Sequence, residues 1–487
     1  MIGVLLVPIL LAAAQTERPQ VQTLNTKDAG YRGIWYMNQP LQNEYRFKYS
    51  GGLGTYCDFH KPFAVYCKEV NRTFFCYGGT ADGSHERHDL TKTSDGADVP
   101  GVLLHMVSYY DHATGKVPRP TILLDKRTKD AHDNPVISVD DRGHVWIFST
   151  SHGTGRPSYI HRSKEPYSID EFERIAATKI EDGNDVPMTN FSYMQSWFVP
   201  KQGFVAFFTR YNYPAARTAC FMTSPDGVRW SSWQKLAAIE EGHYQVSAVS
   251  ESKAATVLNY HPKGKGLNWR TDLYYLETTD FGRSWHAADG RNLTLPLTTP
   301  ENEALVCDYR KEGLLVYIKD IRFDEAGRPV ILFITSRGFR SGPEDGPRTW
   351  TTAHWTGRGW NIRPITNSDN NYDMGSLYIE SDGTWRIIAP TEPGPQTYNP
   401  GGEVAVWTSD DQGSTWRKTK QLTHGSPFNH TYVRRPVNAH DGFYAFWADG
   451  HGRQPSASSL YFSTKAGDVF RLPSHMTQKF AKPQKLD

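Results

Sequence analysis

The sequence predicts an all-β fold, a seven-bladed β-propeller with four-stranded blades. Strand-turn-strand patterns recur seven times, roughly 50 to 75 residues apart, and a repeat of this length built from short strands is typical of a propeller. The 14 Trp and 26 Tyr residues favour strands, and long amphipathic helical stretches are scarce. Sequence motifs of the Asp-box type give the third indication of a propeller.

The seven hairpins follow one another along the whole chain. In the clearest one, residues 136–138 and 145–149 are rich in β-branched and aromatic residues, and the sequence Asp-Asp-Arg-Gly at 140–143 supplies the turn. The seven turns are expected near Asn71, Arg142, Lys201, Ser252, Ala326, Asp382 and His440. Each hairpin is predicted to form the inner two strands of one blade.

Polar and titratable side chains lie at mirror-related positions of several hairpins. His132 and His152 are each ten residues from Arg142, so both imidazoles are expected at the open end of that hairpin. The corresponding ends of the other hairpins are Tyr193 with Arg210, His243 and Tyr244 with Tyr260 and His261, and His430 with His451. Equivalent ends converge on one face of a propeller, which predicts a shared cleft there.

The Asp boxes are predicted to be structural. Residues 278–285 and 409–416 match the full pattern S/T-x-D-x-G-x-S/T-W, and residues 224–230 form a shortened copy. The Asp can accept hydrogen bonds from turn amides, the Gly can adopt a positive φ, and the Trp can pack under the next blade. We therefore expect no catalytic role for these acidic residues.

The N-terminal residues 1–14 read as a signal peptide, with an apolar run that ends in Ala12-Ala13-Ala14. Residues 15–487 are then expected to form a single β-propeller catalytic domain, secreted or periplasmic and without a membrane contact after cleavage. The formal net charge of +2 argues against a dedicated nucleic-acid binder. We expect a monomer.

The five cysteines are too few for a disulfide scaffold. Cys67 and Cys76 would face each other across a hairpin that turns at residues 71–72, so a cross-strand disulfide is one expectation. Buried free thiols are the alternative. No C-x-x-C or H-E-x-x-H pattern indicates a metal site.

The predicted cleft contains His, Tyr and Arg but no evident pair of catalytic carboxylates, which speaks against ordinary glycoside hydrolysis. This set suits β-elimination at a uronic acid. The sugar carboxylate must be neutralised, a base must remove the C5 proton, and a second group must protonate the leaving O4 oxygen. Arg210 beside Tyr193 offers the first two functions, and His132 with His152 supplies the remaining candidates.

These residues resemble a known family, the secreted seven-bladed propeller polysaccharide lyases of the BNR-repeat group, notably the ulvan lyases and the related rhamnosyl-glucuronate lyases. The resemblance runs from residue 31 to residue 462. It is carried by residues 31–35, 51–56, 131–135, 151–153, 192–193, 210–211 and 259–262.

The resemblance implies a role for each predicted site residue. His132 and Tyr193 would transfer protons, Arg210 would neutralise the uronate carboxylate, and His152 would assist. Which of His132 and Tyr193 is the base is left open. The implied substrate-binding residues are Asn134, Tyr244, Tyr260, His261 and Arg270. The implied partner is an anionic uronate polysaccharide in which rhamnose precedes glucuronate, sulfated in the case of ulvan.

The resemblance implies no cofactor for the chemistry. Some relatives bind a structural metal ion, but no complete ligand set can be assigned in this sequence. Two other function classes stay open: a glycosidase of the sialidase or rhamnosidase type, because Asp boxes also occur there, and a non-catalytic carbohydrate-binding propeller. An unsaturated uronate product, which absorbs in the ultraviolet, would separate a lyase from both.

Overall fold

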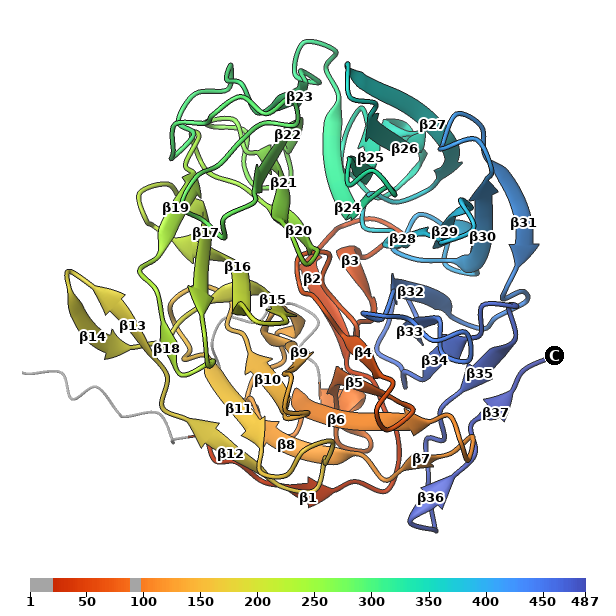
Figure 1. Cartoon of the computed structure of the whole chain (residues 1–487). Coiled ribbons are helices and arrows are strands. Elements are labelled where there is room, and N and C mark those ends of the chain that lie inside the picture. The colour runs from red at the N-terminus through yellow and green to blue at the C-terminus, as the bar shows by residue number, and fades with distance from the viewer. Residues whose placement is uncertain (1–20, 88–97) are drawn as a thin grey trace, which may run out of the picture.

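The computed structural model describes residues 21–87 and 98–487, and it is an all-β propeller with four-stranded antiparallel blades. The sheets are arranged around a central axis, and the first and last sheets of the chain lie side by side (Figure 1). The expected signal peptide at residues 1–14 lies outside the described residues. Among the residues described, no helix is long and apolar enough to cross a membrane.

Seven sheets have four or five strands. In chain order of their inner strands, the first three are β4 (Ala64–Cys67), β5 (Arg72–Gly79), β6 (Leu104–Asp111), β8 (Thr121–Asp125) and β1 (Thr26–Lys27); β9 (Pro135–Val139), β10 (Val145–Ser149), β11 (Tyr159–Ser163) and β12 (Phe172–Ile175); and β15 (Ser192–Val199), β16 (Gly203–Tyr211), β17 (Arg217–Ser224) and β19 (Gln234–Ala237).

The next four sheets complete the ring. They are β20 (Gln245–Val249), β21 (Ala254–Tyr260), β22 (Thr271–Thr278) and β23 (Leu305–Cys307); β24 (Leu315–Phe323), β25 (Pro329–Ser336), β26 (Arg348–Trp355) and β27 (Trp360–Ser368); β28 (Ser376–Ile379), β29 (Trp385–Glu392), β30 (Glu403–Ser409) and β31 (Arg417–Gln421); and β32 (Asn429–Arg434), β33 (Ala445–Gly450), β34 (Leu460–Ser463), β35 (Val469–Arg471) and β37 (Gln484–Lys485).

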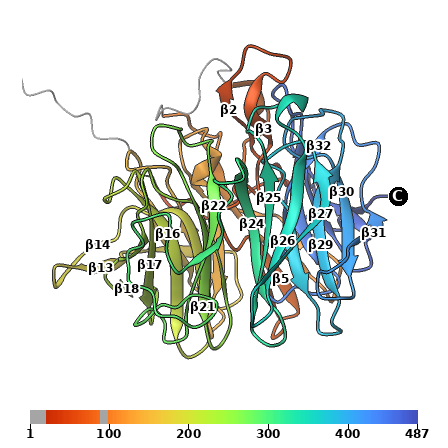
Figure 2. The same cartoon turned by 90° about the horizontal axis from the view of Figure 1, so that it is seen from above.

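Three smaller sheets join or project from this ring. They comprise β2 (Trp35–Pro40) with β3 (Phe47–Gly52), β14 (Asn184–Pro187) with β13 (Thr178–Glu181) and β18 (Arg229–Trp230), and β36 (Phe480–Ala481) with β7 (Val117–Pro118). Short 3-10 helices lie at Ser84–Arg87, Ala131–Asp133 and Pro343–Asp345. The hairpin β2–β3 rises on one face of the disc, as the view along the sheets shows (Figure 2).

All seven predicted hairpins are present, each as the first two strands of one larger sheet. In the hairpin β9–β10, Val139 pairs with Val145 and Ser149 pairs with Pro135, so the register is centred on Arg142 as predicted. The turn chemistry and the β-branched residues were sufficient to set this register.

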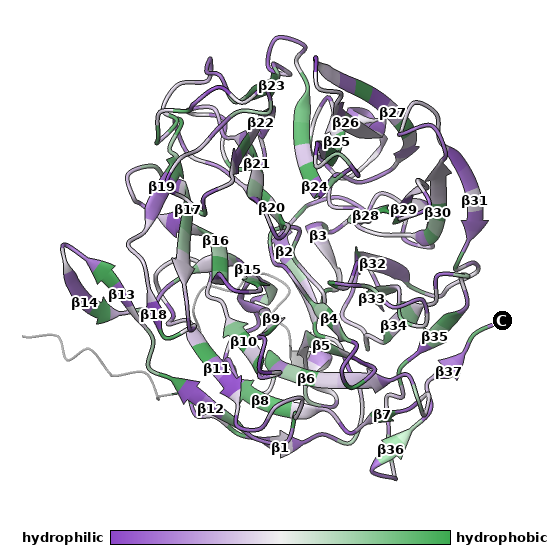
Figure 3. Ribbon diagram, viewed as in Figure 1, coloured by the Kyte–Doolittle hydropathy of each residue, from purple (hydrophilic) through white to green (hydrophobic). Residues whose placement is uncertain are grey.

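Inner strands are apolar and outer strands are polar. Every residue of β24 from Leu315 to Ile321 is buried, whereas all five residues of β31 are exposed. Figure 3 shows the same contrast, with β31 purple and much of β24 green or white. The inner strands are sandwiched between neighbouring sheets, so both of their faces leave water.

The Asp boxes are structural, as expected. Asp280 accepts hydrogen bonds from the backbone amides of Arg283 and Ser284. The ring of Trp285 lies 5.1 Å from that of Phe221, which belongs to β17 of the preceding sheet and not, as expected, to the next one. This box therefore ties its sheet to the one before it.

The predicted disulfide is corrected by the register of the first hairpin. Cys67 pairs with Arg72 across β4–β5, and the amide of Cys76 donates to the carbonyl of Phe63 instead. All five cysteines are free, and Cys67 and Cys76 are buried. The turn lies at residues 68–71 and not at 71–72, so Cys67 and Cys76 are not paired positions of the two strands.

Candidate active site

A pocket opens on the face where the open ends of the inner hairpins converge. Five of the nine predicted site residues line it, namely His132, His152, Tyr193, Tyr244 and Arg270. The other lining residues are Asn38, Gln39, Lys48, Tyr49, Tyr56, Cys57, Asp58, Phe59, Arg217, Leu267, Tyr372 and Tyr432. The structure therefore brings together most of the set that the sequence predicted for this face.

The two histidines stack on each other and share one carboxylate. Their ring centroids are 4.0 Å apart with an interplanar angle of 19°. His132 Nδ1 lies 2.5 Å from Asp130 Oδ1, and His152 Nδ1 lies 2.9 Å from Asp130 Oδ2. A carboxylate only accepts hydrogen bonds, so each Nδ1 carries the proton and each Nε2 is left as an acceptor.

Asp130 is itself held by a buried ionic layer. Arg156 donates to Asp130 Oδ2 at 3.1 Å and to Asp133 Oδ2 at 2.7 Å. Asp133 also accepts from the backbone amide of His152 at 2.7 Å, and Lys126 Nζ lies 3.7 Å from it. Two carboxylates thus lie beside two cations. Burial alone would raise the pKa of Asp130, but its interactions with His132 and His152 outweigh burial and hold the pKa well below its usual range.

The two histidines differ in what their Nε2 atoms meet. His132 Nε2 lies 2.6 Å from the hydroxyl of Tyr56 and 2.9 Å from that of Tyr49, so it accepts a hydrogen bond from a tyrosine. Burial and the neighbouring His152 lower the pKa of His132 to about 4, so this ring is neutral at pH 7. The His152 side chain is 27% exposed, and its Nε2 faces no hydrogen-bond partner among the described residues.

Tyr193 occupies the middle of this group. Its ring centroid is 6.1 Å from His132 and 6.0 Å from His152, and its hydroxyl accepts a 3.3 Å hydrogen bond from Tyr211. A register shift between Ser192 and Gln195 leaves Tyr193 at φ 52°, a left-handed conformation that costs a tyrosine roughly 1–3 kcal/mol. The bulge aims the ring at the propeller axis. Burial holds the pKa of Tyr193 well above its usual value.

Arg210 does not share the pocket, which corrects the most specific of the predicted roles. Its guanidinium carbon lies 3.5 Å from the ring centroid of Trp233 and 4.8 Å from that of Tyr213. Neighbouring residues of a strand point to opposite faces, and the next residue, Tyr211, points at Tyr193. At the turn Val199 pairs with Gly203, which is already one residue out of the expected register, and the bulge at residues 192–195 adds a second shift, so Tyr193 and Arg210 do not pair.

Arg217, which the sequence reasoning missed, takes the place expected for Arg210. It pairs across β16–β17 with Tyr211, and its guanidinium carbon lies 4.8 Å from the Tyr211 ring centroid. Mirror counting about the second turn of this sheet, near residue 214, would have found it. Arg217 is buried, 8% exposed, and has no carboxylate within salt-bridge distance in the described part of the chain.

Arg270 lies against aromatic faces. Its guanidinium carbon is 4.3 Å from the ring centroid of Tyr317 and 4.4 Å from that of Tyr244, which in turn stacks on Phe59 at 4.3 Å. Cation–π contacts hold a guanidinium in place while leaving its edge free for hydrogen bonds. Its Nε donates to the carbonyl oxygen of Leu267.

Lys48, from strand β3, completes a group of three cations in the pocket. Its Nζ lies 5.6 Å from the ring centroid of Tyr49. Burial, with Arg270 and Arg217 nearby, lowers the pKa of Lys48 to about 7. The acidic lining residue, Asp58, is paired with the buried Lys319 at 2.6 Å. Lys48, Arg217 and Arg270 therefore have no carboxylate partner among residues 21–87 and 98–487.

The remaining predicted residues lie outside the pocket. Asn134 is buried and donates to the carbonyl oxygens of Leu53 and Tyr56, so it holds a loop. Tyr260 packs against Tyr274, and His261 is fully buried behind Tyr244, with ring centroids 5.0 Å apart. The structure therefore places Asn134, Tyr260 and His261 outside the pocket lining, where the sequence had led us to expect substrate-binding residues.

The seventh hairpin, β32–β33, is also out of the expected register. His430 pairs with Asp449, not with His451, and its imidazole bonds to Ser426 and Trp447. His451 lies next to Phe428. Neither histidine lines the pocket, and a register shift between Thr431 and Arg434 keeps the two from facing each other.

One group of side chains has the composition of a metal site. The ligand atoms of Asp130, His132 and His152 lie within 4.8 Å of one another. Both histidine Nδ1 atoms are directed at the carboxylate, and Arg156 already donates to it. A divalent cation there would have to displace these hydrogen bonds and sit beside a guanidinium. The residues therefore fit a His–carboxylate–His relay better than a metal centre.

Fold and site together define a β-propeller with a polar central pocket that carries an Asp-bound histidine pair, a tyrosine and uncompensated cations. A model of the BNR repeat-containing family matches residues 106–368, which is more than half of the sequence. The chain belongs to this BNR repeat-containing family.

Individual relatives share the fold at low sequence identity. An ulvan lyase of Alteromonas sp. (strain LOR) is 22% identical over 354 residues, which are 64% of this chain and 69% of that protein. Solved structures of a PL25 ulvan lyase, one of them bound to -[GlcA(1-4)Rha3S]-, align with a TM-score of 0.63 and 16% identity over 90% of this chain and 96% of that one. The polysaccharide lyase Uly1 aligns with a TM-score of 0.59 and 10% identity, over 92% of this chain and 99% of the other.

Proposed function

We propose that the protein is a polysaccharide lyase that cleaves ulvan-type rhamnose-glucuronate polysaccharide by β-elimination at the uronic acid. The observation that carries this proposal is the pocket's charge: Lys48, Arg217 and Arg270 have no carboxylate partner in the described chain and line the same pocket as Tyr193 and His152. Partly buried cations without counterions are costly, and an anionic substrate removes that cost.

The elimination needs three functions, and the pocket offers a group for each. Arg270, with Arg217, would neutralise the uronate carboxylate and so make the C5 proton more acidic. His152 would take that proton on Nε2. The C5–H electron pair forms the C4–C5 double bond, the C4–O4 bond breaks, and the Tyr193 hydroxyl protonates the departing O4. Exchange of protons with solvent restores both side chains.

The hydrogen bonds support His152 as the base and Tyr193 as the acid. His152 Nδ1 is fixed by Asp130 and its Nε2 is accessible, which is the arrangement of a carboxylate-oriented general base. His132 Nε2 is engaged by Tyr56, so His132 would act by positioning His152 and not on the substrate. Tyr193 keeps its proton because burial raises its pKa, and a protonated phenol can serve as the acid.

The relatives support the substrate class. One curated relative is an ulvan lyase, and one solved structure of the same fold holds a saccharide with a glucuronate and a sulfated rhamnose. Such a repeat carries two anionic groups, a carboxylate and a sulfate. Arg270 and Arg217 can meet the first and Lys48 the second.

The test is to incubate the purified protein with ulvan, and in parallel with a non-sulfated rhamnosyl-glucuronate polymer, while following ultraviolet absorbance. A lyase produces an unsaturated uronate and the absorbance rises. New reducing ends without absorbance would indicate a hydrolase. Binding with neither signal would indicate a non-catalytic propeller. Either of these two outcomes contradicts the proposal.

We further propose that the seven sheets of four or five strands are the blades of the propeller. The support is that each of them begins with one of the seven predicted hairpins. Counting the three-stranded sheet of β13, β14 and β18 as a blade would make eight. In this sheet β13 and β14 form a hairpin inserted after the second sheet, and β13 pairs with β18 at two positions. We also propose that the protein is secreted or periplasmic, which the apolar residues 2–11 support.

A further inference from the structure

A second, larger cavity of about 760 Å³ lies at the other end of the propeller axis. Its lining comes from the turn ends of the inner hairpins, including Asp140 and Asp141, Pro200, Glu380 and Ser381, and Ala439. The catalytic pocket is lined by the open ends of the same hairpins. The two cavities therefore lie on opposite faces of the disc.

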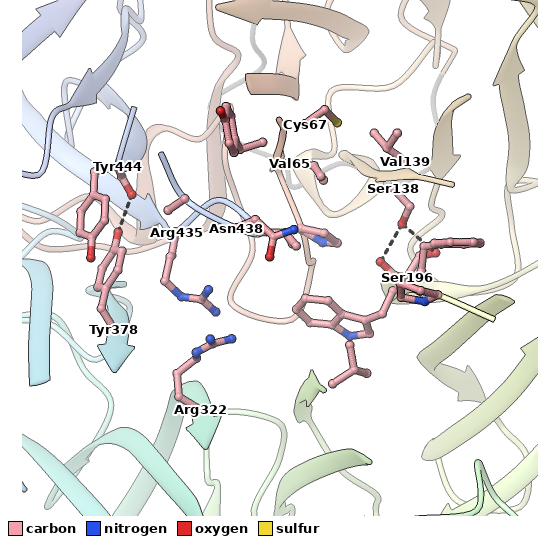
Figure 4. Close-up of a pocket in the computed structure, with 18 of the residues that line it drawn as sticks. Val65, Cys67, Ser138, Val139, Ser196, Arg322, Tyr378, Arg435, Asn438 and Tyr444 are labelled. Carbon is pink, nitrogen blue, oxygen red and sulfur yellow. Dashed lines mark hydrogen bonds between the residues drawn. The ribbon is translucent and has the colours of Figure 1, made fainter. Parts of the chain in front are cut away.

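Two arginines stand at the centre of this second cavity. Arg322 comes from the end of β24 and Arg435 follows β32. Figure 4 shows their guanidinium groups directed toward each other across the cavity. The Nε atoms of both are buried and donate no hydrogen bond to any described residue, and neither arginine forms a salt bridge within the described part of the chain.

The nearby carboxylates are engaged elsewhere. Asp320 is paired with Lys61 and also accepts from the amide of Leu377. Glu380 accepts from Arg386 and pairs with Lys465 at 2.7 Å.

The other acids lie at the rim of the cavity. Asp140 accepts hydrogen bonds within its own turn, from the amides of Arg142 and His144. The remaining acidic lining residues, Glu69, Asp141 and Asp441, are exposed. Asp320 is the nearest of these carboxylates and its charge acts on both arginines, but its hydrogen bonds go to Lys61 and to the backbone, so neither arginine has a salt bridge within the described residues.

Two guanidinium groups that face each other in a partly desolvated space repel each other. Burial, with Arg435 nearby, lowers the pKa of Arg322 to about 9. An oxyanion between the two would remove the repulsion, because each planar fork can donate two parallel hydrogen bonds to sulfate, phosphate or carboxylate oxygens. Aromatic residues also line the cavity, among them Trp197 and Tyr378, and such rings commonly pack against sugars.

We propose that Arg322 and Arg435 form an oxyanion-binding site at the turn-end mouth of the propeller, separate from the catalytic pocket. Its ligand is a sulfate, phosphate or carboxylate group, carried either by a free small anion or by an acidic saccharide. This inference does not depend on the proposed lyase activity.

The interior of the propeller separates the two sites. The ion pair between Lys61 and Asp320 is buried on the axis between them. Along β24, Tyr317 contacts the Arg270 side of the catalytic pocket and Arg322 lies five residues further, roughly 16 Å at the rise of an extended strand. A ligand at one site therefore does not touch the other.

The experiment measures anion binding by calorimetry, with sodium sulfate, glucuronate and a sulfated glucuronate-rhamnose oligosaccharide titrated separately at constant ionic strength. All proteins carry Arg270→Met, which weakens anion binding in the catalytic pocket. Arg322→Met and Arg435→Met are the test variants, and Arg363→Met, at an exposed arginine of β27, is the matched control. Melting temperatures in chloride report on folding.

We expect the two test variants to bind oxyanions at least about tenfold more weakly than the control, since a charge-assisted hydrogen bond is worth about 1.5–3 kcal/mol. In chloride they should melt no lower than the control, because each removes one of two facing like charges.

The three titrants distinguish the sources of the anion. Binding of sulfate alone identifies a small-anion site, and binding of the saccharides identifies a second saccharide site. Equal oxyanion affinity in Arg322→Met, Arg435→Met and the control would overturn the proposal, as would failure of the parent protein to bind any of the three titrants.

Discussion

The two walls of the catalytic pocket handle charge in opposite ways. On the wall formed around Asp130, each ionisable group has a partner: both histidines and Arg156 bond to the one carboxylate. On the opposite wall, Arg270 and Lys48 face aromatic rings and lack carboxylate partners in the described chain. The Asp130 wall lies at the open end of the β9–β10 hairpin, whereas Lys48 comes from β3 and Arg270 directly precedes β22.

The difference indicates what each wall is for. A paired network places its protons at defined atoms, which general acid–base chemistry requires. Unpaired cations in a partly buried site keep their hydrogen-bond donors available for the substrate's charge. If this division holds, changes on the cationic wall should affect binding and transition-state charge, and changes on the Asp130 wall should affect the proton-transfer step.

The largest effect is expected from Arg270→Met. It removes a guanidinium that meets the uronate carboxylate, so kcat/KM on ulvan should fall by about 10²–10³-fold. Initial rates of ultraviolet absorbance measure this. The matched control is Arg210→Met, whose side chain packs on Trp233 outside the pocket and which should retain most activity. The assignment of the cationic wall is wrong if the two variants exchange these outcomes.

A smaller loss is expected from Asp130→Asn, and it should lie in kcat. An amide in place of the carboxylate cannot accept from both histidine Nδ1 atoms, so His152 would lose its fixed tautomer, and kcat should fall by about 10²-fold with KM nearly unchanged. Steady-state kinetics separate the two parameters. A rise in KM at constant kcat would assign Asp130 to substrate binding instead.

Lys48→Met tests the pH response of the cationic wall. The pKa of Lys48 is about 7, so its charge is present below pH 7 and is lost as the pH rises through that value. The wild-type KM should therefore rise with pH above about 7, and Lys48→Met should show a KM about tenfold higher at pH 6 that no longer responds to pH. Substrate binding favours the charged form, which moves this response to somewhat higher pH.

A matched control for Lys48 is Lys263→Met, at an exposed lysine outside the pocket lining. It should leave the pH dependence of KM unchanged. An unaltered pH dependence in Lys48→Met would show that another group titrates in this range.

The smallest effect on activity is expected from Asp280→Ala, which belongs to neither wall. Its carboxylate accepts from the amides of Arg283 and Ser284, so the free energy of unfolding should fall by about 1 kcal/mol while kcat/KM stays the same. These bonds lower the pKa of Asp280 from 3.8 to about 2. Its contribution to stability is therefore complete above pH 4 and is lost as the pH falls toward 2. Urea unfolding at pH 7 and pH 3 measures both effects.

Much of this site could be predicted because hairpin registers depend on local chemistry. The Asp-Asp-Arg-Gly turn centred the β9–β10 register on Arg142, and that alone brought His132 and His152 together. Asp130 could also have been found, since a carboxylate two residues before His132 is close enough in sequence to orient it. Its link to His152 depended on the fold.

Arg210 shows where such counting fails. A bulge adds one residue to a strand without a clear sequence signal, and the register of every residue beyond it shifts by one. The β15–β16 hairpin is one residue out of the expected register from its turn onward, and the bulge adds a second shift. Tyr193 sits in this bulge and still lines the pocket, while Arg210 points away from it and Arg217, from the next strand, lines it instead. A register shift between Thr431 and Arg434 likewise keeps His430 from facing His451.

Local sequence was sufficient for the all-β fold, the seven hairpins and the structural Asp boxes, because turn residues and alternating apolar residues act over a few positions. Tertiary structure alone decided which arginines reach the catalytic pocket, that Asp130 binds two histidines, and that Arg322 meets Arg435. Arg322 and Arg435 come from different sheets, and Asp130, His132 and His152 lie in the segments beyond the ends of β9 and β10, so their proximity depends on how the sheets and their loops pack around the axis.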